Sequence, residues 1–212
     1  RWPLPAKDFL FPEHGRIDKV ATTHGCFLNE VPREFPGLAI DPEFLKRLDP
    51  LFSLVLKAGL ECWLDAKTEH LDRSRVAVLM ANIVLPTDAT CDLTRRLWGP
   101  ELARQAGFAI RQAPPIPDWH PQNRFAAGLP AGFLAKALQL GGGCTTLDAA
   151  CASSIYAVKM ACEELRVGRL DAVITGGANR ASSLFTQMGF SQLRALSPTG
   201  VCRPFDGRAD GL

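Results

Sequence analysis

The chain has 212 residues, of which 47% are apolar and 22% charged, a composition that excludes disordered and collagen-like classes. The formal net charge is +2 and no run of Lys or Arg exceeds a pair, so the sequence offers no electrostatic footprint for nucleic acid or an anionic membrane surface. No window reaches the roughly 18 apolar residues of a membrane span, and no secretory signal opens the chain, so we expect a soluble, cytoplasmic protein.

The first part of the chain, residues 1–40, is rich in proline, glycine and aromatic residues and has no sustained period. This composition predicts a long loop that runs over a surface. The chain begins at Arg1 rather than Met, and it stops within the patterned stretch FDGRADGL. We therefore expect a piece of a larger protein.

Apolar residues at helical spacing follow over residues 41–66. Asp41 is a plausible N-cap, with Pro42 at the first helical position. Pro50 cannot continue a helix without a kink, so we expect a second helix to begin there, after Asp49.

The middle of the chain alternates between apolar runs and breaks. Residues 75–85 (RVAVLMANIVL) are almost free of charge, which predicts a strand buried on both faces. Residues 91–108 suggest a broken helix, and residues 111–125 hold four prolines and predict an irregular excursion. Residues 129–140 predict a short helix that is ended by the glycines at 141–143.

The next elements form a repeating α/β pattern. A strand is expected over residues 144–150, a helix over about 152–167 that ends near Gly168, and a second apolar strand over 170–178. Strand, helix and strand with short connections make a βαβ unit, hence an α/β fold with a parallel sheet and helices on its faces. No internal repeat appears, so we expect one α/β unit.

The seven cysteines are widely spaced and form no C-x-x-C pair, so neither a disulfide framework nor a zinc site is indicated. They are Cys26, Cys62, Cys91, Cys144, Cys151, Cys162 and Cys202. We expect reduced thiols that are mostly buried.

Cys151 stands at the predicted strand-to-helix junction, among the small residues of the stretch TTLDAACASS. Unpaired backbone amides and the helix dipole favour a thiolate there, and the same amides can hold the oxygen of an attacked carbonyl. Small neighbours permit a sharp turn that exposes its apex. The alternative is a small core residue, since cysteine is often buried, and the residue types alone leave both readings open. Cys144, Cys162 and Cys202 are expected to be structural.

Three landmarks in order resemble β-ketoacyl synthases, in particular the ketosynthase domains of type I polyketide and polyunsaturated fatty acid synthases. The first is the stretch FLKRLDPLFSLVLKAGLECWLDA, in which Leu48 stands where the family often has Met. The second is LDAACASSIYAVKMACEELRVGRLDAVITGGAN, with Asp148, Cys151 and the Gly176-Gly177 pair. The third is FSQLRALSPTGVCRPFDGRADG, and the likeness covers most of residues 17–212.

The resemblance implies the thiolase fold, of which residues 1–212 are a partial ketosynthase domain, mainly the N-terminal half without its first strand and helix. It implies that Cys151 accepts an acyl group, that a malonyl thioester loses carbon dioxide, and that the carbanion forms a 3-oxoacyl product. Acyl groups would arrive on the phosphopantetheine of an acyl carrier protein, without another cofactor or metal. By position, Phe190 matches a residue that lines the family's acyl pocket, although an ordinary core phenylalanine is the alternative.

The resemblance also implies a homodimer in which the strand at about 144–149 pairs across the two-fold axis, with the proline-rich loop 113–121 near that interface. The family's two histidines, in His-Gly-Thr and Gly-His motifs, lie downstream of the cysteine. The histidines of this chain are all upstream and are expected to be solvated, so none is assigned a catalytic role; they are His14, His24, His70 and His120. These residues alone are therefore expected to accept an acyl group but not to condense it.

Three alternatives remain. A thiolase or hydroxymethylglutaryl-CoA synthase would share the fold and cysteine, but the FDGRADG stretch is typical of carrier-protein-dependent ketosynthases. A chain-length-factor-like partner usually replaces the nucleophile, whereas Cys151 is intact. An inactive truncated product is the third. An incomplete fold is also expected to leave an apolar sheet face uncovered.

Overall fold

The structure is a computed structural model that describes residues 6, 10, 19–20, 22, 28, 30–38, 40–107, 120–180 and 183–212. The chain divides into two compact units, which we call the sheet unit (Glu30–Arg180) and the α7 unit (Arg1–Asn29 with Ala181–Leu212). The predicted loop over residues 1–40 and the irregular segment 111–125 lie largely outside the described residues, as do His14, His24, Cys26 and residues 113–119 of the expected interface loop.

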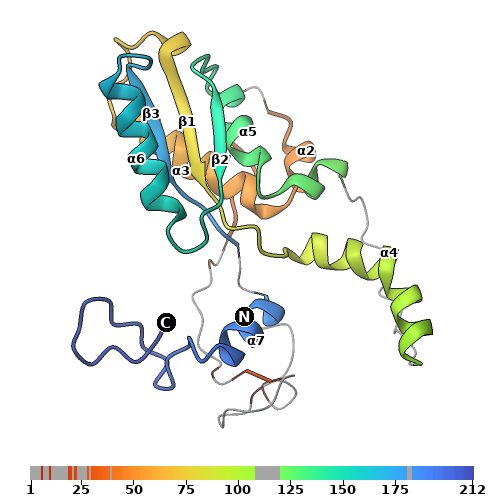
Figure 1. Cartoon of the computed structure of the whole chain (residues 1–212). Coiled ribbons are helices and arrows are strands. Elements are labelled where there is room, and N and C mark those ends of the chain that lie inside the picture. Colours follow the sequence, from red (N-terminus) through yellow and green to blue (C-terminus); the bar gives the residue numbers. More distant parts are fainter. Residues whose placement is uncertain are drawn as a thin grey trace. The chain divides into compact units, whose positions relative to one another are not determined.

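The sheet unit is built on three parallel strands in the order β2-β1-β3 (Figure 1). The strands are β1 (Val76–Ala81), β2 (Cys144–Leu147) and β3 (Ala172–Gly177). Val78 of β1 aligns with Cys144, and Val76 aligns with Ala172. The parallel sheet predicted from the βαβ pattern is thus confirmed.

The central strand β1 is almost wholly buried, as its uninterrupted apolar run predicts. It ends at Ala81, four residues before the predicted end. Asn82 follows Ala81; its backbone amide still donates to the Leu147 carbonyl, and its buried side chain donates to the Ala127 carbonyl at 2.9 Å. The polar Asn82 thus interrupts the apolar run where the strand ends.

Helices cover both faces of the sheet (Figure 1). One face carries α3 (Pro50–Asp65) and α5 (Leu129–Ala137), which pack on each other, and the other carries α6 (Ser153–Arg166). The expected uncovered sheet face is therefore wrong, because α6 lies over it. Apolar side chains on the outer side of α6 remain exposed, among them Ile155, which is 73% exposed.

The core lies between the sheet and the α3–α5 pair. Phe52 and Leu134 are 1% exposed, and the rings of Phe52 and Phe133 meet edge to face with centroids 5.8 Å apart. The two helices approach closely at Gly59, because a Cβ added there would lie 2.3 Å from a methyl carbon of Leu134.

Two aspartates start the first helices, as predicted. Asp41 caps α2 (Pro42–Lys46) by accepting from the Glu43 amide at 2.9 Å, and Asp49 caps α3 through the Leu51 amide at 2.9 Å. The corner between these helices is fixed by the buried Asn123 of the short helix η2 (Pro121–Phe125). Its side chain accepts from the Asp49 amide at 2.7 Å and donates to the Arg47 carbonyl at 2.9 Å.

Two helix predictions need correction. The helix α4 (Asp88–Ala106) is continuous, although Pro100 lies inside it and its ribbon bends along its length (Figure 1). The helix α5 ends at Ala137 rather than at the glycines 141–143, because Gln139 takes the left-handed conformation with φ of 57°. None of the helices in the described part of the chain is long and apolar enough to cross a membrane.

The glycines 141–143 instead lead into β2. They lie beside the start of β1, which follows the short helix η1 (Arg73–Arg75). The Gly142 amide donates to the Val76 carbonyl at 3.0 Å, and a Cβ at Gly142 would lie 2.7 Å from that carbonyl. Gly142→Ala is therefore expected to lower the free energy of unfolding by about 2–3 kcal/mol, since the obstacle is backbone.

The measurement is urea unfolding of Gly142→Ala beside Gly128→Ala, whose added Cβ meets nothing within 4 Å. The control is expected to change the free energy of unfolding by less than about 1 kcal/mol. Equal losses in the two variants would contradict a steric cause at Gly142.

Candidate active site

Cys151 lies in the connection between Leu147, the last residue of β2, and Ser153, the first residue of α6. Its side chain is exposed and its thiol is free. The N-cap residue of α6 is Ala152, which supplies no side-chain hydrogen bond to the first turn. Apart from the Ser153 amide, which donates to the Ala150 carbonyl, the amides of that turn have no side-chain cap and can serve an oxygen of a bound group.

The backbone makes a sharp turn immediately before the cysteine. Ala150 has φ of 51°, a left-handed conformation that costs a residue with a Cβ roughly 1–2 kcal/mol. The amides of Ala152 and Ser153 donate back to the carbonyls of Ala149 and Ala150, each at 3.2 Å. The small side chains fit this turn, which matches the predicted strand-to-helix corner with the cysteine at its apex.

The buried hydroxyl of Ser153 braces the turn from inside. It accepts from the Ala149 amide at 2.8 Å and donates to the Ala150 carbonyl at 2.6 Å. The hydroxyl thereby holds the amide of the residue before the strained Ala150 and the carbonyl of Ala150 itself.

The carboxylate of Asp148 braces the same turn from the other side. One oxygen accepts from the Ala150 amide and the other from the Val84 amide, both at 2.9 Å. These bonds, with Val84 the larger cause, hold the pKa of Asp148 below its ordinary value of 3.8, so the carboxylate is ionised at neutral pH. Sequence reasoning placed Asp148 in a motif without a role; its contact two residues ahead is a recognisable local pattern, but its contact with Val84 is not.

Gly177, at the end of β3, allows the first turn of α6 to lie close to the sheet. A Cβ at Gly177 would be 3.4 Å from the Ser154 Cβ, whereas one at Gly176 would meet nothing within 4 Å. The predicted glycine pair thus has one member with a packing role.

The prediction that the cysteines are mostly buried is wrong, although the described ones are free thiols as expected. Five are exposed and Cys91 is half-buried; the exposed ones are Cys62, Cys144, Cys151, Cys162 and Cys202. Cys144 lies on the edge strand β2 and Cys162 on α6, which explains their exposure, since β2 pairs on one side only. Exposure alone therefore does not single out Cys151; its turn does.

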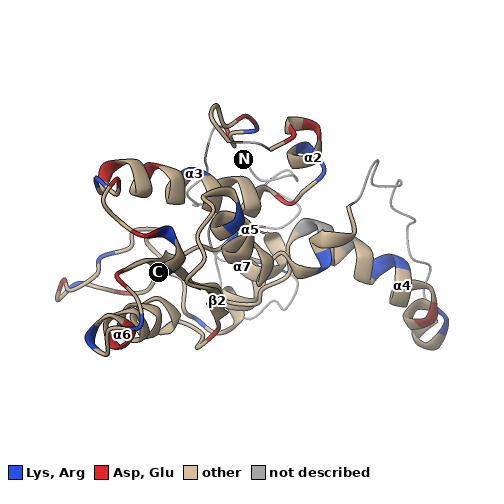
Figure 2. Ribbon diagram, turned by 90° about the horizontal axis from the view of Figure 1, so that it is seen from above, with Lys and Arg blue, Asp and Glu red and all other residues tan. Residues whose placement is uncertain are grey.

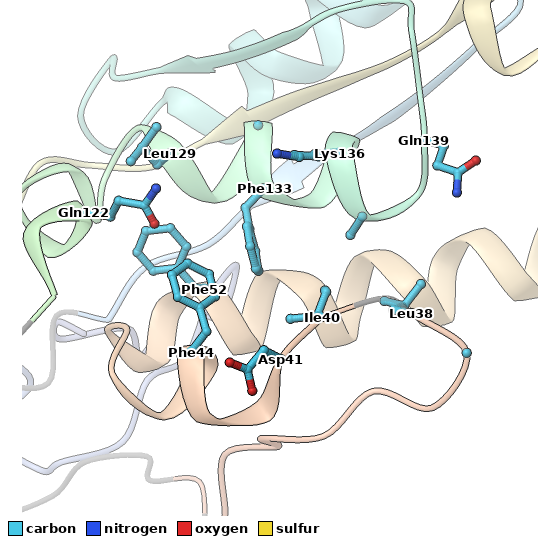
Figure 3. A pocket seen from close by; sticks show the side chains of 13 residues that line it. Leu38, Ile40, Asp41, Phe44, Phe52, Gln122, Leu129, Phe133, Lys136 and Gln139 are labelled. Atoms are coloured by element: carbon cyan, nitrogen blue, oxygen red, sulfur yellow. The ribbon is translucent and has the colours of Figure 1, made fainter.

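Two cavities lie elsewhere in the sheet unit. One of about 650 Å³ lies between α5 and the α2–α3 pair, where Phe44, Phe52 and Phe133 meet (Figure 3). The other, of about 540 Å³, is bordered by residues 141–145 and by Met160 of α6. Cys151 lines neither of them, and its side chain is exposed within this unit.

Within the part of the chain that the structure describes, charges and metal ligands do not mark a second site. Charged residues of both signs lie on α4 and on α6 (Figure 2), and Lys159 pairs with Glu163 on α6. Of the two described histidines, His70 is exposed as expected. His120 caps η2 and packs edge to face on Phe44 with ring centroids 5.0 Å apart, so its ring is half-buried rather than fully solvated. The described residues contain no metal-binding group of three or more His, Cys, Asp or Glu.

Phe190 belongs to the other unit, on α7 (Leu184–Gln192), and is half-buried there. Cys151 and Phe190 are thus each defined within their own unit, and the role of Phe190 stays a prediction. After α7, the Asp210 carboxylate closes the FDGRADG loop by accepting from the hydroxyls of Ser197 at 2.6 Å and Thr199 at 3.0 Å.

The Ser197 hydrogen bond, the largest cause, lowers the pKa of Asp210 below its ordinary 3.8. A lowered folded pKa stabilises the loop above the unfolded pKa, and the contribution is lost as pH falls through the folded value. Hydrogen exchange of the Ser197 amide, which donates to the Leu212 carbonyl, is thus expected to lose protection as pH falls from 5 to below about 3. If the Ser197 amide of Asp210→Asn is as well protected at pH 5 as that of the wild type, the stabilising role of the Asp210 carboxylate would be contradicted.

Comparison with known proteins matches this architecture to a family. A family model described as "Beta-ketoacyl synthase, N-terminal domain" matches residues 4–212. The chain is 42% identical over 192 residues to a phenolphthiocerol/phthiocerol polyketide synthase of Mycobacterium tuberculosis, and the match covers 90% of the chain and 9% of that protein. It is 29% identical over 211 residues to the highly reducing polyketide synthase ausV of Aspergillus calidoustus, and this match covers 96% of the chain and 7% of that protein.

Solved structures agree with the sequence relatives. The structure described as "PfaC Keto synthase-Chain length factor" aligns with a TM-score of 0.82 and 27% identity, over all of this chain and 24% of that one. The ketosynthase ApeO of Xenorhabdus doucetiae, solved with its chain length factor ApeC, aligns with a TM-score of 0.59 and 27% identity, over 82% of this chain and 41% of that one. The chain thus spans a tenth or less of the two sequence relatives, and the predicted thiolase-like α/β fold is confirmed. It belongs to the beta-ketoacyl synthase family, whose N-terminal domain its residues 4–212 match.

Proposed function

We propose that Cys151 is the acyl-accepting nucleophile of a condensing enzyme, a 3-oxoacyl-carrier-protein synthase. The observation that supports this most directly is an exposed, free thiol at the apex of a braced left-handed turn before a helix, in a chain of the beta-ketoacyl synthase family. A thiol in that place is open to a thioester, and the uncapped first turn of α6 offers amides to the developing oxyanion.

The reaction has two steps. The Cys151 sulfur attacks the carbonyl carbon of an acyl thioester, and the carrier thiol leaves with the proton, giving an acyl-enzyme. A malonyl thioester then releases carbon dioxide, and its carbanion attacks the acyl-enzyme carbonyl, expelling the Cys151 thiolate and giving a 3-oxoacyl thioester. The second step needs acid/base groups. No histidine follows Cys151 in these residues, so we assign only the first step to them.

The substrates and partners follow from the same proposal. An acyl carrier protein delivers acyl and malonyl groups on phosphopantetheine, and two copies of the chain pair along the edge strand β2, whose outer edge is open in the sheet. Phe190 contributes to the acyl pocket. We also propose a cytoplasmic location.

A second candidate is a chain-length-factor-like partner that shapes the product without forming the acyl-enzyme. It is favoured by two similar structures, one described as a ketosynthase-chain length factor and one as a ketosynthase in complex with its chain length factor. The intact and exposed Cys151 favours the enzyme, because a partner of that kind has no use for an accessible thiol at this turn.

The test supplies the protein with acyl-pantetheine and malonyl-pantetheine and follows both the acyl-enzyme, by intact mass, and the 3-oxoacyl product, by chromatography. Formation of the acyl-enzyme supports the proposed first step, and product that depends on Cys151 supports the whole reaction. If neither the acyl-enzyme nor the product is formed, the result would favour the chain-length-factor-like role.

A further inference from the structure

We propose that Asp148 is a positioning residue for Cys151, through a carboxylate latch that ties the turn before the cysteine to the loop after β1. This inference rests on the proposed function, because it concerns acyl transfer to Cys151. The latch consists of the two bonds from the Ala150 and Val84 amides to the two carboxylate oxygens.

The latch continues the pairing of β1 and β2 beyond the ends of both strands. The last backbone link between them is the Asn82 amide, which donates to the Leu147 carbonyl at 3.1 Å. Past this point the chains separate, and the Asp148 side chain makes the next link, to Val84 at 2.9 Å. The loop after β1 is thereby linked to the residue three positions before Cys151.

The other oxygen of Asp148 acts directly on the strained residue. Ala150 has φ of 51°, and its amide is the one that Asp148 accepts from at 2.9 Å. The Ser153 hydroxyl accepts from the Ala149 amide at 2.8 Å and donates to the Ala150 carbonyl at 2.6 Å. The Cys151 amide takes part in none of these bonds, so the latch orients the cysteine while leaving its own N–H out of the network.

Acid/base chemistry by Asp148 does not fit this geometry. Both oxygens already accept hydrogen bonds, and these bonds keep the pKa of the carboxyl low, so it carries no proton to give at neutral pH. An asparagine has one acceptor oxygen instead of two, so it can keep one of the two bonds, and an alanine can keep neither. A latch therefore predicts a graded response to these two variants.

The experiment compares acylation of Cys151 by acyl-pantetheine in the wild type, Asp148→Asn and Asp148→Ala. The maximal rate is expected to fall about 3–10-fold in the asparagine variant and about 10–100-fold in the alanine variant, since small misplacements of reacting groups have effects of that size. The thioester concentration at half-maximal rate is expected to stay within about twofold, because Asp148 does not touch the substrate.

The matched control is Asp72→Ala. Asp72 makes the same contact two residues ahead, accepting from the Ser74 amide at 2.9 Å. It lies before the start of β1, however, whereas Asp148 lies past the end of β2. Its loss is expected to change the acylation rate less than about twofold. Alkylation of Cys151 by iodoacetamide, relative to the exposed Cys162 in the same sample, reports on presentation of the thiol without any thioester. This ratio is expected to fall in Asp148→Ala, to fall less in Asp148→Asn, and to stay unchanged in Asp72→Ala.

The outcomes separate the two claims. If the wild type is acylated and Asp148→Ala is acylated equally fast, the latch alone is overturned. The latch alone is also overturned if Asp72→Ala is slowed as much as Asp148→Ala. A wild type in which Cys151 accepts no acyl group overturns the proposed function. In that case an unchanged Cys151 to Cys162 alkylation ratio in Asp148→Ala overturns the latch as well, and a lowered ratio supports it.

Discussion

Cys151→Ala is expected to lower the rate of acyl transfer to the protein by at least about 10³-fold, because alanine lacks the sulfur that forms the covalent bond. The fold is expected to persist in this variant. The side chain is exposed, and the braces around it come from Asp148 and Ser153 rather than from the thiol. Loss of acyl transfer therefore reports on chemistry rather than on stability.

The matched control is Cys162→Ala, which removes an exposed thiol from α6 itself, eleven positions further along the chain. Cys162 lies beyond the first turn, away from the uncapped amides, and its removal is expected to leave the rate within about twofold. Both variants are assayed for acyl-enzyme by intact mass and for folding by circular dichroism. Full acyl transfer in Cys151→Ala, or its loss in Cys162→Ala, would contradict the assignment.

The largest effect on stability is expected from Phe52→Ala, at about 3–5 kcal/mol of unfolding free energy. Phe52 is 1% exposed, and its ring packs on Phe133 between α3 and α5. Phe52 lines the cavity of about 650 Å³, so removal of its ring enlarges a void that already exists (Figure 3). Such a loss is a large part of the roughly 5–15 kcal/mol typical of a domain.

Urea unfolding of Phe52→Ala measures this loss, with Leu64→Ala as the control on the same helix. Leu64 is 69% exposed, so Leu64→Ala is expected to change the free energy of unfolding by less than about 0.5 kcal/mol. A Phe52→Ala variant within about 1 kcal/mol of the wild type would show that the α3–α5 layer does not carry the stability of the sheet unit.

Local signals predicted the elements well. The strand at 76–81 and the caps at Asp41 and Asp49 follow from an uncharged apolar run and from Asp-Pro pairs, which act over a few residues. The same is true of the helix that begins at Ser153. The place of this helix along the chain could be predicted from the sequence, whereas the elements on which it packs are known only from the three-dimensional structure.

Predictions that depend on distant parts of the chain fared worse. The end of α5 was expected at a glycine, but Gln139 adopts the left-handed conformation, while the glycines approach the backbone of β1 at Val76. The exposure of Cys144 depends on the position of β2 at the edge of the sheet, which no local pattern reveals. A pairing order is a property of the whole fold.

The braces of the candidate site show the same division. The Ser153 hydroxyl and the Asp148 contact with Ala150 span four residues or fewer, and a sequence can suggest them. The second Asp148 contact joins residues 64 positions apart, because β1 and β2 happen to lie side by side. The proposed nucleophile could be predicted from the sequence, but the Val84 half of the proposed latch could not.

The most direct measurement is the site of the adduct after the protein reacts with a short acyl-pantetheine thioester. Proteolysis and tandem mass spectrometry locate the acyl group among the exposed thiols, which are Cys62, Cys144, Cys151, Cys162 and Cys202. The account predicts a thioester on Cys151 and unmodified sulfur at the other four. Acyl groups spread evenly over these cysteines, or none on Cys151, would contradict its role as the nucleophile.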